Sequence, residues 1–302
     1  MPLRVHHLNC TTMCPPGGRM MDGRTHVSGP ASLVCHCLLV ETDRGLVLVD
    51  TGFGLNDVRY PRQRLSRLFL DVLCRPQLNE EMTAIRQIER LGFKASDVCD
   101  ILLTHLDFDH AGGLDDFPDA RVHLLDSEYL GAVAQQTPLD RRRFRPRQWM
   151  HETNWVTYPK PTEGERWFGF ECVRELSGLP PELLLVPLLG HTLGHTGIAL
   201  QVDGRWMLHA GDAYFYHGEM APSRRRCTPG LRFYQTLMQK NARLRHYNLQ
   251  RLRELVKQHG SEVTVFCAHD AEEFERLEEA EKVPADSPFR TMPVDSQPTL
   301  HV

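Results

Sequence analysis

Hydrophobic residues lie along the chain in short apolar runs separated by turns, with helical spacing in a few longer segments. Eight runs have the length and content typical of buried strands: residues 32–40, 46–50, 98–103, 121–125, 183–188, 196–202, 205–210 and 261–267. Segment 80–91 has apolar residues at helical spacing and is followed by Gly92, and segments 233–259 and 272–282 also predict helices. The pattern therefore predicts an α/β protein.

The remaining segments lack such regularity. The first 30 residues are rich in Gly, Pro, Met and Cys and predict loop, while segment 126–180 has three of the four Trp with many Arg and Pro. We expect a single domain over 1–275, in which 126–180 is an insertion of helices and loops covering the site, and a helix end with an extended tail over 276–302. Segment 65–73 has helical apolar spacing, which favours packing in the core and leaves a homodimer open.

Composition excludes several classes of protein. The 302 residues are 41% hydrophobic and 25% charged, which is typical of a globular protein. The net charge of −4 does not favour a nucleic-acid partner. We interpret the basic runs 141–145 and 224–226 as solvated surface, with steering of an anionic substrate as the alternative. No signal peptide or membrane span is evident and no C-x-x-C pair occurs, so we expect a cytoplasmic protein with reduced thiols.

Histidine and aspartate follow the expected strands in a recurring way. They occur at the carboxyl ends of five of them, at Asp50, within 105–110, at His191, at Asp212 and at His269. Sheet enzymes usually place their sites in loops at one end of the strands, so we expect these residues to converge. Imidazole and carboxylate groups suit divalent ions. Enough ligands for two ions are present, namely His105, Asp107, Asp109, His110, His191, Asp212 and His269.

The same residues carry a resemblance to a known family. Segment 104–113, Thr-His-Leu-Asp-Phe-Asp-His-Ala-Gly-Gly, resembles the H-x-H-x-D-H-x-G-G motif of the metallo-β-lactamase superfamily, and 49–52, 190–195, 210–212 and 268–270 resemble its other motifs in order. Stretches 18–22 and 39–52 are most similar to N-acyl-homoserine-lactone lactonases. The resemblance implies an αββα sandwich, in which two sheets face each other between outer helices.

It also implies a role for each residue. His105, position 107 and His191 would hold one ion, Asp109, His110 and His269 would hold the other, and Asp212 would bridge them. Asp109 and Asp212 would serve catalysis, with Asp109 moving a proton. Asp50 and His195 would lie behind the ligands and orient them.

Two positions depart from the family pattern. Asp107 stands where the family has its second histidine, so zinc is the expected metal with manganese or iron as alternatives, and one ion is expected if Asp107 points away. The lactonases have a substrate-directed tyrosine three residues after the bridging aspartate, where this chain has Phe215. Tyr214 and Tyr216 flank it, and with Phe108 they are our candidates for a substrate pocket.

We therefore predict a metal-dependent hydrolase that uses activated water on a small ester, lactone or thioester. Two alternatives stay open. One is a non-haem iron enzyme that handles oxygen, because the flavodiiron proteins have a carboxylate at the position that corresponds to Asp107. The expectation of a flavodoxin-like domain, which accompanies that family, is not met by the residues that follow. The other is a metal-binding protein without catalytic activity.

Overall fold

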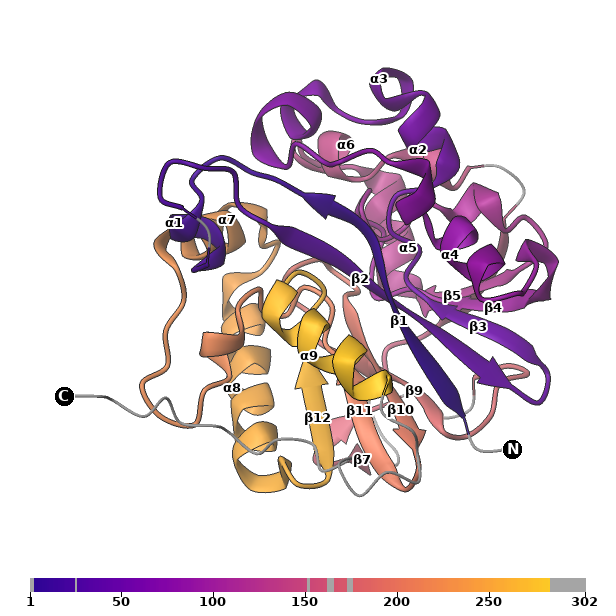
Figure 1. Cartoon of the computed structure of the whole chain (residues 1–302). Helices are drawn as coiled ribbons and strands as arrows, with labels where there is room; N and C mark the ends of the chain where they lie inside the picture. The colour runs from indigo at the N-terminus through magenta and orange to yellow at the C-terminus, as the bar shows by residue number, and fades with distance from the viewer. Residues whose placement is uncertain (1–2, 25, 151–152, 162–165, 173–175, 283–302) are drawn as a thin grey trace.

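The computed structural model describes residues 3–24, 26–150, 153–161, 166–172 and 176–282. They form a six-stranded sheet in the order β1-β2-β3-β4-β5-β6 and a four-stranded sheet in the order β12-β11-β10-β9 (Figure 1). A core cluster drawn from the facing sides of both sheets joins them, with Leu38 and Val49 from one sheet and Leu185 and Ile198 from the other. The expected αββα sandwich is confirmed.

The strands of the two sheets have the following residue ranges. The first sheet contains β1 (Arg4–Met13), β2 (Leu33–Thr42), β3 (Gly45–Val49), β4 (Val98–Leu102), β5 (Arg121–Leu125) and β6 (Asn154–Tyr158). The second contains β9 (Leu183–Pro187), β10 (Thr196–Val202), β11 (Arg205–His209) and β12 (Val263–Phe266), and a small hairpin joins β7 (Arg166–Trp167) to β8 (Phe170–Glu171).

Helices cover the outer faces of the sheets. The α-helices are α1 (Arg19–Asp22), α2 (Leu55–Arg59), α3 (Pro61–Arg64), α4 (Ala84–Arg90), α5 (Asp126–Ala134), α6 (Asp140–Arg143), α7 (Pro229–Met238), α8 (Ala242–His259) and α9 (Ala271–Glu281). Short turns of other helix types are η1 (Phe69–Leu73), η2 (Glu80–Met82), η3 (Ala95–Asp97), η4 (Leu114–Asp116), η5 (Pro146–Gln148) and η6 (His217–Glu219). No helix in the described ranges is long and apolar enough to cross a membrane.

Burial on both faces explains the continuous apolar runs of the central strands. Along β2, Leu38 packs toward the second sheet whereas Leu39 packs toward the outer helices. Successive side chains of a strand point to opposite faces, so a strand buried on both faces must be apolar throughout. This is why periodicity alone located β2, β3, β4 and β9 to within a few residues.

The amino-terminal segment was wrongly expected to be loop. It contains β1, a ten-residue strand that pairs antiparallel with β2 and has an irregularity between Asn9 and Thr12. Its many His, Asn and Thr side chains hide the strand pattern. The histidines find partners in distant segments, as His6 does with Glu41 and with Glu281 of α9.

Two other segments also differ from expectation. Segment 126–180 contributes β6, which pairs with β5, so part of it belongs to the sheet itself. The single helix expected over 233–259 is divided into α7 and α8, because the side chain of Asn241 caps α8 by accepting a hydrogen bond from the Leu244 amide. The expected domain boundary at 275 falls within α9, and the tail beyond 282 lies outside the described residues.

Segment 65–73 contains both buried and exposed apolar side chains. Leu65 and Phe69 are buried in a core cluster with residues of the second sheet's loops, whereas Val72 is half exposed. The core packing that the spacing favoured is therefore present for two of its side chains.

Candidate metal centre

The loops that follow β3, β4, β9, β11 and β12 converge on one cluster of histidine and aspartate side chains. All seven expected ligands are in it, and each of these residues is at most 6% exposed. Because β3 and β4 are parallel, as are β11 and β12, their carboxyl ends lie at the same edge of each sheet. The strand-end pattern of the sequence therefore corresponds to a real convergence in space.

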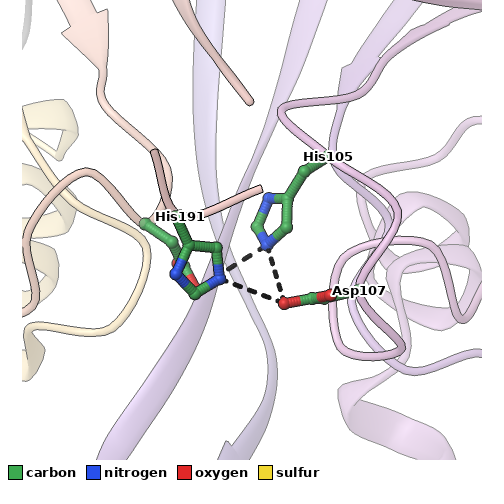
Figure 2. A group of neighbouring side chains, drawn as sticks. His105, Asp107 and His191 are labelled. Carbon is green, nitrogen blue, oxygen red and sulfur yellow. Dashed lines mark hydrogen bonds and ion pairs between the residues drawn. The ribbon is translucent and has the colours of Figure 1, made fainter. Parts of the chain in front are cut away.

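The first ligand group consists of His105, Asp107, His191 and Asp212. Figure 2 shows three of these side chains pointing toward one another from two loops. The Asp107 Oδ2 atom lies 3.3 Å from His105 Nε2 and 3.1 Å from His191 Nε2. Asp212 Oδ2 lies 3.1 Å from the same His191 atom. Asp107 thus points into the cluster and not away from it.

The second ligand group consists of Asp109, His110, His269 and Asp212. Asp212 Oδ1 lies 3.4 Å from His110 Nε2 and 3.0 Å from His269 Nε2, and Asp109 Oδ2 lies 3.6 Å from the latter atom. Among the described residues, His110 Nε2 and Asp212 Oδ1 are buried without a hydrogen-bond partner. Buried polar atoms are normally satisfied, so these orphaned atoms fit a cation as the missing partner. The sulfur of Cys35 also lies within ligand distance of Asp109 and His269.

Asp50 lies behind the second ligand group and bonds to one of its histidines. Its carboxylate accepts hydrogen bonds from the Thr104 amide and hydroxyl, both at 2.8 Å, and from His110 Nδ1 at 2.8 Å. The last contact places the His110 proton on Nδ1 and leaves Nε2 free to bind a cation. Asp50 has a φ of 53°, so the backbone turns sharply where β3 ends.

His195 is held in an analogous way but offers no free nitrogen. Its Nδ1 donates to the Leu188 carbonyl at 3.0 Å, and its Nε2 accepts the Asp212 amide at 2.9 Å. Both ring nitrogens are therefore used by the backbone. His195 thus bonds to the Asp212 loop, and its expected role behind the ligands stays a prediction.

Sequence reasoning missed Glu128, which ties two ligand loops together. This buried residue of α5 accepts the Leu106 amide at 2.9 Å, the Thr192 hydroxyl at 2.6 Å and the Gly194 amide at 3.0 Å. Its three donors come from the segments that carry His105 and His191. No local motif marks Glu128, since its partners are distant in the chain.

Arg143 was also missed, and the interpretation of 141–145 as solvated surface is wrong at this residue. Arg141 and Arg142 are exposed, but Arg143 is completely buried at the end of α6. Its Nε donates to Asp107 Oδ1 at 2.6 Å, and its Nη2 donates to Asp107 Oδ2. The available signal was Asp107 itself, because a buried carboxylate in place of a histidine requires a compensating positive charge.

The buried charges determine which groups are ionised. Burial alone would raise the pKa of Asp107, but the Arg143 guanidinium and the neighbouring histidines hold it well below its usual range. Burial likewise opposes ionisation of Asp212, whose pKa is nevertheless lowered by His269, His110 and His191. Both carboxyl groups are therefore charged at neutral pH.

The proposed pocket residues occupy different surroundings. Tyr214 is completely buried, and its hydroxyl donates to the Glu273 carboxylate at 2.9 Å, so its position does not fit a pocket role. Tyr216 packs with its hydroxyl against Gly23, and Phe108 lies in a core cluster with Phe215 and Tyr216. Phe215 is the aromatic residue that faces the ligands, because its ring stacks on His269 with centroids 5.1 Å apart.

Replacing Tyr214 by Phe should therefore affect stability and not catalysis. The change removes one donor from the buried Glu273 carboxylate, which we expect to lower the free energy of unfolding by about 1–2 kcal/mol. Urea unfolding would measure the loss, and turnover should stay within about twofold of the unchanged protein. Tyr60→Phe, at an exposed tyrosine, is the control. A drop in turnover without loss of stability would instead support a role for Tyr214 in the substrate pocket.

Comparison with known sequences agrees with this geometry. The sequence profile described as the metallo-β-lactamase superfamily matches residues 32–245. A probable metallo-hydrolase of Mycobacterium tuberculosis is 41% identical over 269 residues, covering 89% of this chain and 81% of the relative. An N-acyl homoserine lactonase of a Bacillus species is 31% identical over 194 residues, covering 62% of this chain and 69% of the relative.

Solved structures show the same architecture. An N-acyl homoserine lactone hydrolase with the product N-hexanoyl-L-homoserine at its catalytic metal centre superposes with a TM-score of 0.67 at 20% identity, over 91% of this chain and 96% of that one. A dizinc quorum-quenching lactonase gives a TM-score of 0.58 at 15% identity, over 88% and 87% of the two chains. At these identities the likeness concerns the fold.

Proposed function

Since this chain belongs to the metallo-β-lactamase superfamily, we propose that it hydrolyses a small ester, lactone or thioester with the help of a divalent ion in the second ligand group. Its relatives are named as metallo-hydrolases and lactonases, which supports hydrolysis as the class of reaction. The observation that carries the proposal is a pair of buried atoms without hydrogen-bond partners, His110 Nε2 and Asp212 Oδ1, which lie 3.4 Å apart.

The ligands of this group suit the chemistry. A divalent ion held there supplies Lewis acidity, which acidifies water and polarises a carbonyl oxygen. Asp50 fixes the His110 ring, and His195 fixes the amide of Asp212, so the ligand atoms are positioned before substrate arrives. Preorganisation of this kind lowers the cost of reaching the transition state.

Asp109 is our candidate for moving the proton. Burial raises the pKa of its carboxyl group above the usual value, although His110 and His269 oppose the rise. A carboxylate with a raised pKa is a better proton acceptor near neutral pH. At 6% exposure Asp109 is also the least buried of the expected ligands, which favours contact with a substrate.

Zinc is the metal we propose. Two imidazoles, carboxylates and the nearby Cys35 sulfur make a mixed donor set that favours zinc over the harder ions. The sequence predicted a second ion in the first ligand group. That group is less suited to a metal ion, because both Asp107 oxygens and His191 Nε2 already contact Arg143.

Other expectations about the protein remain predictions. We propose a small-molecule substrate and no nucleic-acid or membrane partner, in keeping with the net charge of −4 and the burial of the ligands. Location in the cytoplasm and the homodimer left open by segment 65–73 are matters for fractionation and sedimentation experiments.

The function is tested by metal analysis followed by a substrate panel. Protein purified without added metal is analysed by elemental mass spectrometry, then assayed on lactones, alkyl esters and thioesters before and after chelation. We expect bound zinc, and hydrolysis that chelation removes and zinc restores. Hydrolysis that persists in metal-free protein would refute the proposal. Bound iron with oxygen uptake would instead support the oxygen-dependent alternative.

A further inference from the structure

Arg143 lies directly against the first ligand group. Its guanidinium is completely buried and bonds to three partners. Nε and Nη2 hold both oxygens of Asp107, Nη2 also lies 2.8 Å from His191 Nε2, and Nη1 donates to the Met238 carbonyl at 2.5 Å. Three of the five N–H groups of this side chain therefore have an oxygen acceptor, and a fourth lies beside His191 Nε2.

Arg143 Nη2 lies beside the nitrogen that His191 would offer to a metal ion in the first ligand group. An arginine side chain can only donate hydrogen bonds, so Nη2 can bond to His191 Nε2 only when the ring proton lies on Nδ1. In the other tautomer the same Nε2 donates to Asp107 Oδ2, 3.1 Å away. An imidazole nitrogen has one lone pair in the plane of the ring. The Nη2 proton and a metal ion in the first ligand group would compete for it.

Both oxygens of Asp107 are also bonded to Arg143 and are not free to bind a metal ion. Its two oxygens are paired with two guanidinium nitrogens in the parallel arrangement that arginine forms with carboxylates. Arginine stays protonated in proteins, so it cannot give up its charge to make room for a second cation. A divalent ion bound to Asp107 and His191 would lie close to a fixed positive charge in a dry site, where repulsion is poorly screened.

The second ligand group has no such occupant. In the described part of the chain, His110 Nε2 and Asp212 Oδ1 lack hydrogen-bond partners, as does His105 Nε2 of the first ligand group. The ion pairs of Asp109 found there are with His269 and not with arginine or lysine. The two halves of the cluster therefore differ, since one already contains a cation from the protein and the other does not.

We propose that the Arg143 guanidinium takes the place of the first metal ion, so that the folded protein binds one divalent ion, in the second ligand group. The exchange of the family's histidine for Asp107 and the burial of Arg143 form one feature, in which each charge compensates the other. The fixed guanidinium leaves the cluster with a positive charge beside the single ion. The proposal rests on the metal binding of the proposed function but not on the reaction catalysed.

Zinc stoichiometry tests this directly. Metal-free protein is titrated with zinc alone against a chromophoric chelator, and the bound metal is counted by elemental mass spectrometry. We expect about one equivalent per chain for the unchanged protein. The double variant Asp107→His with Arg143→Gln restores the family's ligand and removes the guanidinium, and we expect it to bind about two equivalents. Arg142→Gln, at the exposed neighbour, is the matched control and should stay at one.

Each zinc stoichiometry supports or overturns the proposal of a single metal ion. Two equivalents in the unchanged protein would overturn the proposal and leave the hydrolase intact, whereas no bound zinc would overturn both. One equivalent without hydrolysis of any panel substrate would support the single ion and remove the proposed function. If the double variant folds, as judged by circular dichroism, and still binds one equivalent, Arg143 is not what excludes the second ion. If it does not fold, the stoichiometry of the unchanged protein decides alone.

Discussion

Replacing Asp212 by Ala is expected to abolish metal binding and lower turnover by at least about 1,000-fold, the scale of losing a principal electrostatic group in an active site. Its two oxygens contact both halves of the cluster, with Oδ2 near His191 and Oδ1 near His110 and His269. Without this carboxylate the histidines of the second ligand group lose the negative charge that balances a cation.

The effect of Asp212→Ala is measured by elemental analysis and by turnover of the best substrate from the panel. Asp119→Ala, at an exposed aspartate, is the control and should keep both properties. Circular dichroism distinguishes loss of metal from loss of fold. A folded Asp212→Ala protein that retains zinc and turnover would refute a metal centre built on this residue.

Asp50→Asn should weaken metal binding by about 10–100-fold, the usual effect of removing the partner behind a metal ligand. The amide keeps the size of the side chain and tolerates the left-handed backbone at this position, where φ is 53°. One oxygen remains for the Thr104 amide, but an NH2 group then faces either that amide or His110 Nδ1. The His110 ring therefore loses its fixed orientation.

A chelator competition titration gives the zinc affinity of Asp50→Asn. The matched control is Asp100→Asn, a buried aspartate of β4 that pairs with His123 and Arg121 away from the ligands. We expect this control to lose stability while its zinc affinity stays unchanged. Equal affinities for the unchanged protein and Asp50→Asn would show that Asp50 supports the fold alone.

The strand ends were the most predictable part of this protein. Apolar runs of four to eight residues report burial directly, and the family's ligand order follows them along the chain. The seven expected ligands were named from these local signals, and the structure brings all of them together. The motif 104–113 is contiguous, so its spacing is itself a local property that needs no knowledge of packing.

Segments whose polar residues are buried were predictable only in part. β1 was expected to be loop because its His, Asn and Thr side chains give no strand pattern, yet its two histidines bond to side chains of β2 and α9. A polar residue becomes compatible with a buried strand only when a distant group bonds to it. That condition cannot be read from the neighbouring residues.

The sequence by itself determined eight strands of the two main sheets, the family and the identity of the candidate ligands, because apolar runs and motif spacing are local. Only the tertiary structure decided that Arg143 of the basic run 141–145 is buried and binds Asp107, 36 positions earlier in the chain. The same holds for Glu128, which joins two loops from a third segment. A charged side chain is stable in the interior only beside its partner, and the partner is chosen by the fold.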